Sequence, residues 1–412
     1  MASAADQIIS SLQSFALLIA ALQHLDLQEL GIFSLTYAMM TLALTVSRSR
    51  NLEPLVVLRR DRSTEPGEEL RDDSAAVGTS LLHGTALAVA CAVGALVLRE
   101  PLLLACGVAF PWILAQDAYR YIHFAERRQS LAAVQDGVAL VATLALIALL
   151  YATDAVSATS LIAAWGVGAL FGMVAGFAQT RALPEFRGLT GWTKRSGELG
   201  RGNALSTMIQ QGVGRLSQVL ISVIASPAAL GAITASRTVF MPANTALTAS
   251  MSFALPEGVS THGRRGTSGL SKFIAAVSIV LSIGVTLLIL ALLLLPDSIG
   301  RLISEDNWPT IRSLTIPTGL WVLGMALSQG PKVGLRVLGA GALLMRVSTT
   351  TGLLLLTSTA LGAYFGDARG AAWGFGLTSI ACNLLWWKAY SDRARGGTPP
   401  LSTGTGEPEG TA

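Results

Sequence analysis

Apolar residues fill this chain in long runs, and short polar segments separate them. The clearest run, residues 273–295, carries no charged side chain. Because about 20 apolar residues at helical rise cross the hydrocarbon core of a bilayer, each such run predicts a transmembrane helix. We expect about twelve helices, at residues 6–25, 31–48, 79–98, 101–119, 131–152, 159–179, 202–225, 228–254, 273–296, 311–330, 336–364 and 370–390.

Basic residues are distributed unequally between the linkers that join these helices. The linkers after every second helix, with the C-terminal end, contain Arg59, Arg60, Arg62, Arg127, Arg128, Arg187, Lys194, Arg195, Arg264, Arg265, Lys332 and Arg393. The opposite linkers contain only Arg99, Arg301, Arg312 and Arg369. Since cytoplasmic loops are enriched in Lys and Arg, this asymmetry predicts that both termini are cytoplasmic.

Short motifs recur at offsets of 200 to 208 residues, which indicates two tandem copies of a six-helix unit. The matched pairs are Leu30-Gly31 with Leu230-Gly231, the proline-containing helix exits at Pro54 and Pro256, and the segments 163–168 (AAWGVG) and 371–376 (AAWGFG). We expect Trp165 and Trp373 of the last pair to pack against neighbouring helices. Because six is even, both copies enter the membrane in the same sense, with a substrate path between them.

The repeat predicts the domain organisation of this all-α polytopic membrane protein. We expect an N-terminal six-helix lobe at residues 1–183, a cytoplasmic linker at 184–201 and a C-terminal lobe at 202–392, around a central cavity. Residues 393–412 are rich in Gly, Pro and Thr and predict a disordered tail. Residues 60–74 carry charges of both signs and predict a solvated loop.

Polar residues recur at helical spacing on four predicted helices, which makes these helices candidates to line the cavity. The stripes comprise Ser10, Gln13 and Ser14 on the first helix; Ser34, Tyr37, Thr41, Thr45 and Arg48 on the second; Gln211, Arg215, Gln218 and Ser222 on the seventh; and Thr234, Arg237, Thr245, Thr248 and Ser252 on the eighth. We take Gln13, Tyr37, Thr41, Gln211 and Gln218 as candidate substrate-binding residues. Pro242 predicts a kink close to Arg237.

Arg215, Arg237 and Arg346 lie well inside predicted helices. An arginine at the centre of a bilayer costs about 2.5–3.5 kcal/mol to insert, so each needs compensation. One interpretation is pairing with a carboxylate or with helix carbonyls, or extension of the side chain to the interface. The interpretation that we favour is a hydrated cationic cavity for an anionic ligand, because a guanidinium donates two hydrogen bonds at once to a phosphate.

Two acids, Asp117 and Asp136, flank a short basic linker between the fourth and fifth helices. They predict a local ion-pair cluster with Arg120, Arg127 and Arg128 that fastens this helical hairpin. The alternative is a proton or cation site.

The composition excludes several classes of protein. Only 13% of the residues are charged, against about a quarter in soluble domains, so lipid is the solvent of this fold. The net charge of +4 comes from scattered basic residues and not from a nucleic-acid-binding patch. The three cysteines and four histidines form no metal-ligand spacing, and no catalytic motif is apparent. We therefore expect no metal, no cofactor and no enzyme.

Two six-helix lobes, polar stripes on helices 1, 2, 7 and 8, intramembrane arginines and exits at Pro54 and Pro256 together resemble the multidrug/oligosaccharidyl-lipid/polysaccharide (MOP) exporter superfamily. Within it, the chain is most similar to the Wzx-like polysaccharide flippases. The resemblance implies alternating access in the plasma membrane and transfer of a lipid-diphosphate-linked glycan for the cell envelope. Membrane lipids and glycan-assembly proteins would be its partners. The diphosphate would bind Arg215 and Arg237, with Arg346 as a further candidate.

Two other functions stay open at this stage. A drug exporter of the same fold often has a carboxylate in its first helix, where this chain has Gln13 and only Asp6 at the helix edge. A membrane glycan polymerase or ligase would need a large outside loop, and the longest one expected here, residues 296–310, is short.

Overall fold

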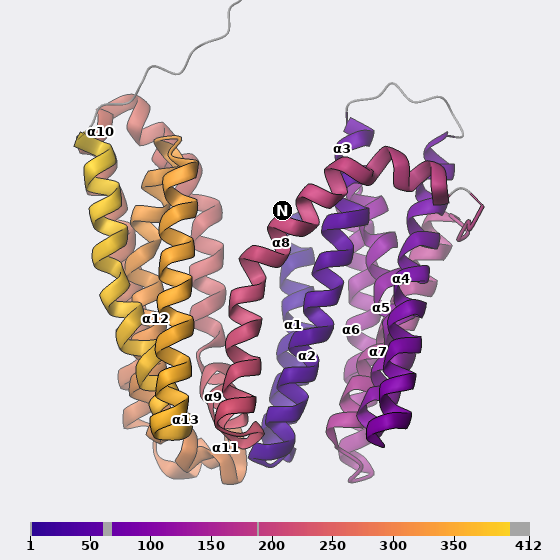
Figure 1. Ribbon diagram of the computed structural model, residues 1–412, viewed down its shortest axis with the longest axis horizontal. Coiled ribbons are helices and arrows are strands. Elements are labelled where there is room, and N and C mark those ends of the chain that lie inside the picture. Colours follow the sequence, from indigo (N-terminus) through magenta and orange to yellow (C-terminus); the bar gives the residue numbers. More distant parts are fainter. Residues whose placement is uncertain (1, 61–67, 188, 396–412) are drawn as a thin grey trace, which may run out of the picture. The chain divides into compact units, whose positions relative to one another are not determined.

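The computed structural model describes residues 2–60, 68–187 and 189–395, and these residues form helices and no strand (Figure 1). In chain order they are α1 (Ala2–His24), α2 (Leu27–Ser47), the π-helical turn η1 (Arg48–Leu52), α3 (Glu53–Arg60), α4 (Glu68–Leu98), α5 (Pro101–Ala125), α6 (Gln129–Ala152), α7 (Ala158–Thr180), α8 (Leu189–Ile224), α9 (Pro227–Val239), α10 (Met241–Leu294), α11 (Asp297–Ser304), the 3₁₀ turn η2 (Glu305–Asn307), α12 (Trp308–Val337) and α13 (Gly341–Arg395). The prediction of an all-α fold is confirmed.

Two long helices each consist of two arms. The first arm of α10 ends at Gly266, which has φ 59° and ψ −163°, and α13 breaks at Gly366 and Asp367. Each of these helices thus accounts for two predicted ones. On length and composition alone, six helices of the described residues are long and apolar enough to cross a membrane. Among the described residues, the apolar parts of α1 and α8, Leu12–His24 and Gly214–Ile224, are shorter than these six.

The prediction that Pro54 and Pro256 end their helices is wrong. Pro54 is the second residue of α3, which continues directly from η1, and Pro256 lies inside the first arm of α10. Because the helix runs on through η1 into α3, Pro54 removes one backbone hydrogen bond directly after the π-helical turn without ending the helix. Pro256 costs one backbone hydrogen bond, but the helix continues to Gly266, which takes a backbone conformation that only glycine adopts easily.

The predicted loop at residues 60–74 is also partly wrong. Residues 61–67 lie outside the described residues, but α4 already begins at Glu68. Asp73 is buried there and accepts a hydrogen bond from Arg59 at 2.7 Å, so the ion pair stabilises α3 against the first turns of α4. Most of the predicted linker 184–201 belongs to α8. The predicted disordered tail at 393–412 is wrong for residues 393–395, which belong to α13, and residues 396–412 lie outside the described residues.

The chain divides into two compact units. The first comprises Met1–Val239, Leu295–Leu314 and Thr359–Ala371, and the second comprises Phe240–Leu294, Thr315–Ser358 and Ala372–Ala412. The two-lobe organisation expected from the repeat stays a prediction, and each unit is described below by itself.

In the first unit, the repeated Leu-Gly motifs lie against each other where α2 crosses α9. A Cβ atom on Gly31 would be 1.7 Å from the carbonyl oxygen of Pro227, and one on Gly231 would be 1.8 Å from that of Leu27. The contact is reciprocal, and its members are related by the same offset as the repeat. Only glycine at both positions allows the two backbones to approach this closely.

The core of the first unit lies between α1, α2, α5 and α7. Leu22, Phe33, Leu114 and Leu161 are almost completely buried in it. Asn307 of η2 donates to the carbonyl oxygens of Leu22 and Leu25 at the end of α1, so a buried side chain satisfies carbonyl groups that the helix leaves free. Helix α8 starts beside α3 and α4 and continues next to α2 (Figure 1).

The second unit packs α12 against the second arms of α10 and α13. Gly330 approaches the carbonyl oxygen of Ile274, and Gly324 approaches the backbone of Ser379. Hydrogen bonds stabilise both contacts: Ser278 donates to the carbonyl oxygen of Leu327 at 3.0 Å, and Asn383 donates to that of Gly324 at 3.1 Å. Small residues and buried polar groups therefore hold these helices together, as is usual in lipid.

Candidate functional site in the first unit

A polar cavity of about 150 Å³ lies within the first unit, between α1, α2, α5, α6 and α7. Its walls contain side chains from segments that are far apart in the sequence. The lining residues are Gln13, Ser14, Leu17, Tyr37, Thr41, Leu44, Thr45, Arg48, Ile113, Gln116, Asp117, Arg120, Asp136 and Trp165.

Arg48 and Asp117 form a bidentate ion pair in the lining of this cavity. The Nε and NH2 groups of Arg48 donate to the two carboxylate oxygens at 2.6 and 2.7 Å. Arg48 is the first residue of η1, and Asn51 fixes this turn by accepting from Trp192 and donating to Ser80. A π-helical turn shifts side chains relative to a regular helix, and such turns are frequent at functional sites.

Arg120 and Asp136 form a second, more deeply buried pair. Their side chains are 9% and 6% exposed, and Arg120 Nε lies 3.1 Å from a carboxylate oxygen of Asp136. Gln116 donates to the other oxygen at 3.2 Å. Arg120 is also 3.9 Å from Asp117, so it joins both pairs into one network.

Helix α7 packs closely against the α5 residues beside this network. A Cβ atom on Gly172 would be 2.9 Å from the side chain of Gln116, and one on Gly176 would be 2.6 Å from that of Tyr119. Gln135 donates to the Gln116 carbonyl oxygen at 2.7 Å. Glycines on α7 thus leave room for the polar side chains of α5.

The remaining wall combines hydroxyl groups with aromatic rings. Gln13 donates to Thr143 at 2.9 Å, and the Tyr37 hydroxyl donates to Ser14 at 2.9 Å. The ring of Trp165 lies against Tyr37, with 5.0 Å between ring centres. Trp165 is 8% exposed, as expected for a packed residue, whereas its counterpart Trp373 is 41% exposed, so the packing expected of Trp373 is not observed.

The structure brings three of the eight candidate binding residues, Gln13, Tyr37 and Thr41, into this cavity. Arg215 lies on α8 within electrostatic range of Tyr37. Gln218, one turn further along, is half-buried, and its side-chain oxygen has no hydrogen-bond partner within the described part of the chain. Gln211 is exposed on the same helix.

All three candidate arginines, Arg215 included, lie outside the cavity lining. Arg237 is half-buried near the end of α9, directly before the break between α9 and α10, where Pro242 lies in the first turn of α10. Arg346 belongs to the second unit and is exposed on α13. The binding roles of all eight residues stay predictions.

The predicted ion-pair cluster is partly correct. Arg120 pairs with both acids, but Arg128 pairs with Glu126 at 3.5 Å, and the second partner of Asp117 is Arg48. Arg48 is 69 residues away from Asp117, so spacing gave no sign of the pair. Its place on the polar stripe of α2 was the one available signal.

The chemistry of this cavity follows from its charge balance. Each carboxylate that lines it is bound to a guanidinium, and hydroxyl and amide groups fill the remaining wall. Paired charges of this kind offer little attraction to a cation. Arg215 adds a positive charge beside Tyr37.

No protein-family model and no curated protein sequence matches this chain. Solved structures do match. The lipid II flippase MurJ in an inward closed conformation has a TM-score of 0.73 at 11% identity, covering 95% of this chain and 90% of that one. An inward-facing multidrug resistance MATE family transporter of the MOP superfamily has a TM-score of 0.68 at 11% identity, covering 96% and 98%.

A third solved structure is a MOP superfamily transporter from Pyrococcus furiosus, with a TM-score of 0.56 and 13% identity over 96% of this chain and 94% of that one. Its description states that the reverse polarity of its binding pocket suggests a different function. This chain therefore has the twelve-helix fold of the MOP superfamily transporters. All three of these structures are described as transporters or flippases.

Proposed function

We propose that this protein is a flippase that moves a lipid-linked oligosaccharide or polysaccharide precursor across the cytoplasmic membrane by alternating access. The observation that carries this proposal is the charge balance of the first unit. Asp117 and Asp136 are both bound to arginines, while Arg215 lies on α8, which packs against α2, within electrostatic range of Tyr37.

An organic cation needs an accessible carboxylate in a low-dielectric site. Here it would have to displace Arg48 from two short hydrogen bonds, or Arg120 from a pair that is almost fully buried. Removing one partner of such a pair costs about 3–5 kcal/mol, because the remaining charge stays buried. A diphosphate would instead gain charge-assisted hydrogen bonds from Arg215.

The fold is compatible with such a substrate. One solved structure of this fold is described as a lipid II flippase, so a protein with this fold can transfer a lipid. We propose by analogy that membrane lipids surround the transport path here, with both termini in the cytoplasm and glycan-assembly proteins as partners.

The second candidate is a small-molecule or drug exporter. The observation that favours it is the presence of two carboxylates in a cavity that also has aromatic walls, at Tyr37 and Trp165. This function would require Asp117 or Asp136 to leave its arginine during transport. A MATE family transporter shares the fold, so the two candidates differ in ligand charge and not in architecture.

Binding measurements on the purified full-length protein separate the two. We expect undecaprenyl diphosphate to bind, and Arg215→Gln to weaken its binding about tenfold, because a hydrogen bond to a charged group contributes roughly 1.5–3 kcal/mol. Arg201→Gln is the matched control, since Arg201 lies on the same helix and is exposed. Tight binding of tetraphenylphosphonium that is unaffected by Arg215→Gln, without binding of the diphosphate, would overturn the proposal.

A further inference from the structure

The second unit contains a larger pocket where α10 folds back on itself. The break lies at Gly266, whose φ of 59° is in the left-handed region that favours glycine. Residues before the break belong to the first arm of α10 and residues after it to the second. Polar residues of both arms therefore line the same pocket.

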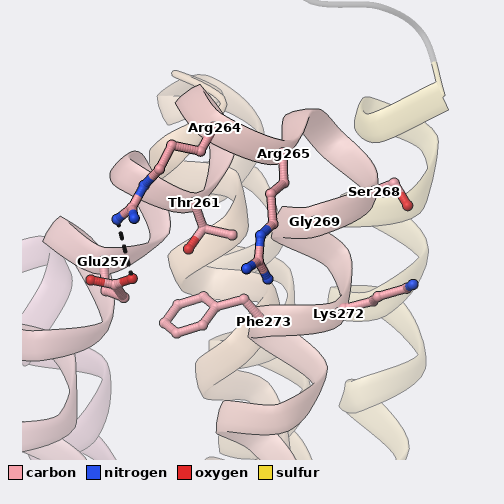
Figure 2. A pocket seen from close by; sticks show the side chains of 8 residues that line it. All are labelled: Glu257, Thr261, Arg264, Arg265, Ser268, Gly269, Lys272 and Phe273. Atoms are coloured by element: carbon pink, nitrogen blue, oxygen red, sulfur yellow. Dashed lines mark ion pairs between the residues drawn. The ribbon is translucent and has the colours of Figure 1, made fainter.

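This pocket has a volume of about 560 Å³, in the usual range of small-molecule sites. Figure 2 shows its lining: Glu257, Thr261, Arg264 and Arg265 from the first arm, and Ser268, Gly269, Lys272 and Phe273 from the second. In this view the Arg265 side chain extends toward Phe273, and Lys272 extends away from it.

The lining carries an excess of positive charge. Its single acid, Glu257, lies 3.8 Å from Arg264, which also donates to Ser260. Arg265 and Lys272 form no ion pair with any of the described residues. Arg265 therefore remains as a donor for a ligand, and Lys272 adds a second positive charge on the other side of the lining, which also contains the hydroxyl groups of Thr261 and Ser268.

The pocket lies where the chain passes from a polar surface into an apolar span. The uncharged run of the second arm begins at Phe273, directly after Lys272. The first residues of such a span lie at the depth of lipid head groups. The basic linker of which Arg264 and Arg265 are part is predicted to be cytoplasmic, the side on which anionic lipids attract basic segments.

From this geometry we infer a phosphate-binding site at the Gly266 break, formed by Arg265 and Lys272 and suited to the phosphodiester head group of an anionic lipid. The planar guanidinium can donate two hydrogen bonds to phosphate oxygens, and the ammonium adds a point charge. The site does not depend on which substrate the protein transports.

Gly269 gives the pocket its shape. A Cβ atom at this position would be 2.3 Å from the Cβ atom of Arg265, so any larger residue would displace the Arg265 side chain. If the basic residues served only to orient the protein in the membrane, Arg265 would not need this close packing against Gly269. The Gly269→Ala substitution consequently tests geometry while leaving every charge in place.

The test uses the purified full-length protein and two short-chain probes, dioctanoyl-phosphatidylglycerol and the neutral dioctanoyl-phosphatidylcholine, at low ionic strength. We expect the wild type to bind the anionic probe at least tenfold more tightly than the neutral one. Arg265→Gln with Lys272→Gln should remove this preference, and Gly269→Ala should weaken anionic binding about tenfold. Because Arg265 and Lys272 are exposed, the double variant should keep its unfolding temperature.

Arg336→Gln is the matched control, because Arg336 is exposed in the same unit but does not line the pocket. It should bind the anionic probe within about twofold of the wild type. Equal binding of the two probes by the wild type would overturn the inference. So would equal losses in Arg336→Gln and in the double variant, since charge near the membrane would then suffice without a site.

Competition distinguishes the two sources of phosphate. If inorganic phosphate displaces the anionic probe at similar concentration, the site takes free phosphate; if only phosphatidylglycerol displaces it, the site takes a lipid head group. Failure of the proposed flippase function would leave these results unchanged, because Arg215→Gln does not alter the lining of this pocket.

Discussion

The cavity of the first unit and the pocket at the Gly266 break contain the same kinds of side chain in opposite arrangements. In the cavity, each carboxylate is bound to an arginine and the Arg120–Asp136 pair is almost fully buried. In the pocket, the one pair is 71% and 58% exposed, and two further cations have no ion pair among the described residues.

The difference shows what each arrangement can contribute. Buried pairs fix helices relative to one another, because a charge left alone there is strongly destabilising. Exposed pairs contribute little to stability, and an excess of one charge attracts ligands of the other sign. The paired charges of the cavity therefore favour a rigid wall, whereas the excess positive charge of the pocket favours binding of an anion.

The largest expected effect comes from breaking the buried pair. Arg120→Gln should lower the free energy of unfolding by about 3–5 kcal/mol, because Asp136 would stay buried with fewer donors. Replacing both partners, Arg120→Met with Asp136→Leu, should recover most of this loss. Denaturant titration of the purified protein measures both. A single variant as stable as the wild type would contradict the buried network.

The second effect concerns the glycine crossing that holds α9 against α2, the helix that carries Tyr37 and Thr41. Gly231→Ala should cost about 1–3 kcal/mol, since its Cβ would overlap the carbonyl oxygen of Leu27. Gly212→Ala is the matched control on α8, where nothing lies within 4 Å, and it should be neutral or slightly stabilising. Thermal unfolding followed by circular dichroism compares the two.

If Gly231→Ala also weakens diphosphate binding but leaves the preference for phosphatidylglycerol unchanged, ligand binding in the first unit is independent of the pocket at the Gly266 break. If Gly231→Ala were as harmless as Gly212→Ala, the close approach of the two repeat motifs would be wrong.

The third effect applies the same arginine-to-glutamine change to the exposed pair. Arg264→Gln should alter the free energy of unfolding by no more than about 1 kcal/mol, because solvent screens its pairing with Glu257. The same denaturant titration provides the measurement. A loss as large as that of Arg120→Gln would remove the distinction between the cavity and the pocket.

The smallest effect concerns Asp297 on α11, outside the membrane-spanning segments. A hydrogen bond from Trp308, together with Arg312 at 2.5 Å, holds the pKa of this carboxyl below its ordinary value of 3.8. A lowered pKa in the folded state contributes stability above pH 3.8, which is lost as the pH falls through the folded value. The unfolding temperature of Asp297→Asn should thus depend less on pH below about pH 4 than that of the wild type. Parallel pH profiles would contradict this.

The sequence predicted the helical fold well because lipid imposes one strong rule, that a spanning segment must be apolar and helical. It also predicted the repeat from Leu30-Gly31 and Leu230-Gly231. The sequence shows that these motifs are alike, but not that they contact each other. The crossing of Gly31 with Gly231 depends on the packing of α2 and α9, which no local pattern encodes.

The candidate site was predicted in part for the same reason. Three residues of the polar stripes, Gln13, Tyr37 and Thr41, line a cavity within the first unit, whereas the central cavity expected between the two repeats stays a prediction. The pairing of Arg48 with Asp117 could not be predicted, because it joins α5 to a π-helical turn in a different part of the chain. Helix ends were misjudged at Pro54 and Pro256, since in both places the helix continues past the proline at the cost of a backbone hydrogen bond.

The central claim of the proposed function is that this protein transports a lipid-linked anion. The most direct test reconstitutes the protein in liposomes with a fluorescent undecaprenyl-diphosphate sugar and follows its transfer between leaflets with a membrane-impermeant quencher. We predict transfer by the wild type and by Arg201→Gln, and about tenfold slower transfer by Arg215→Gln. Uptake of an organic cation without transfer of the lipid-linked sugar would contradict the account.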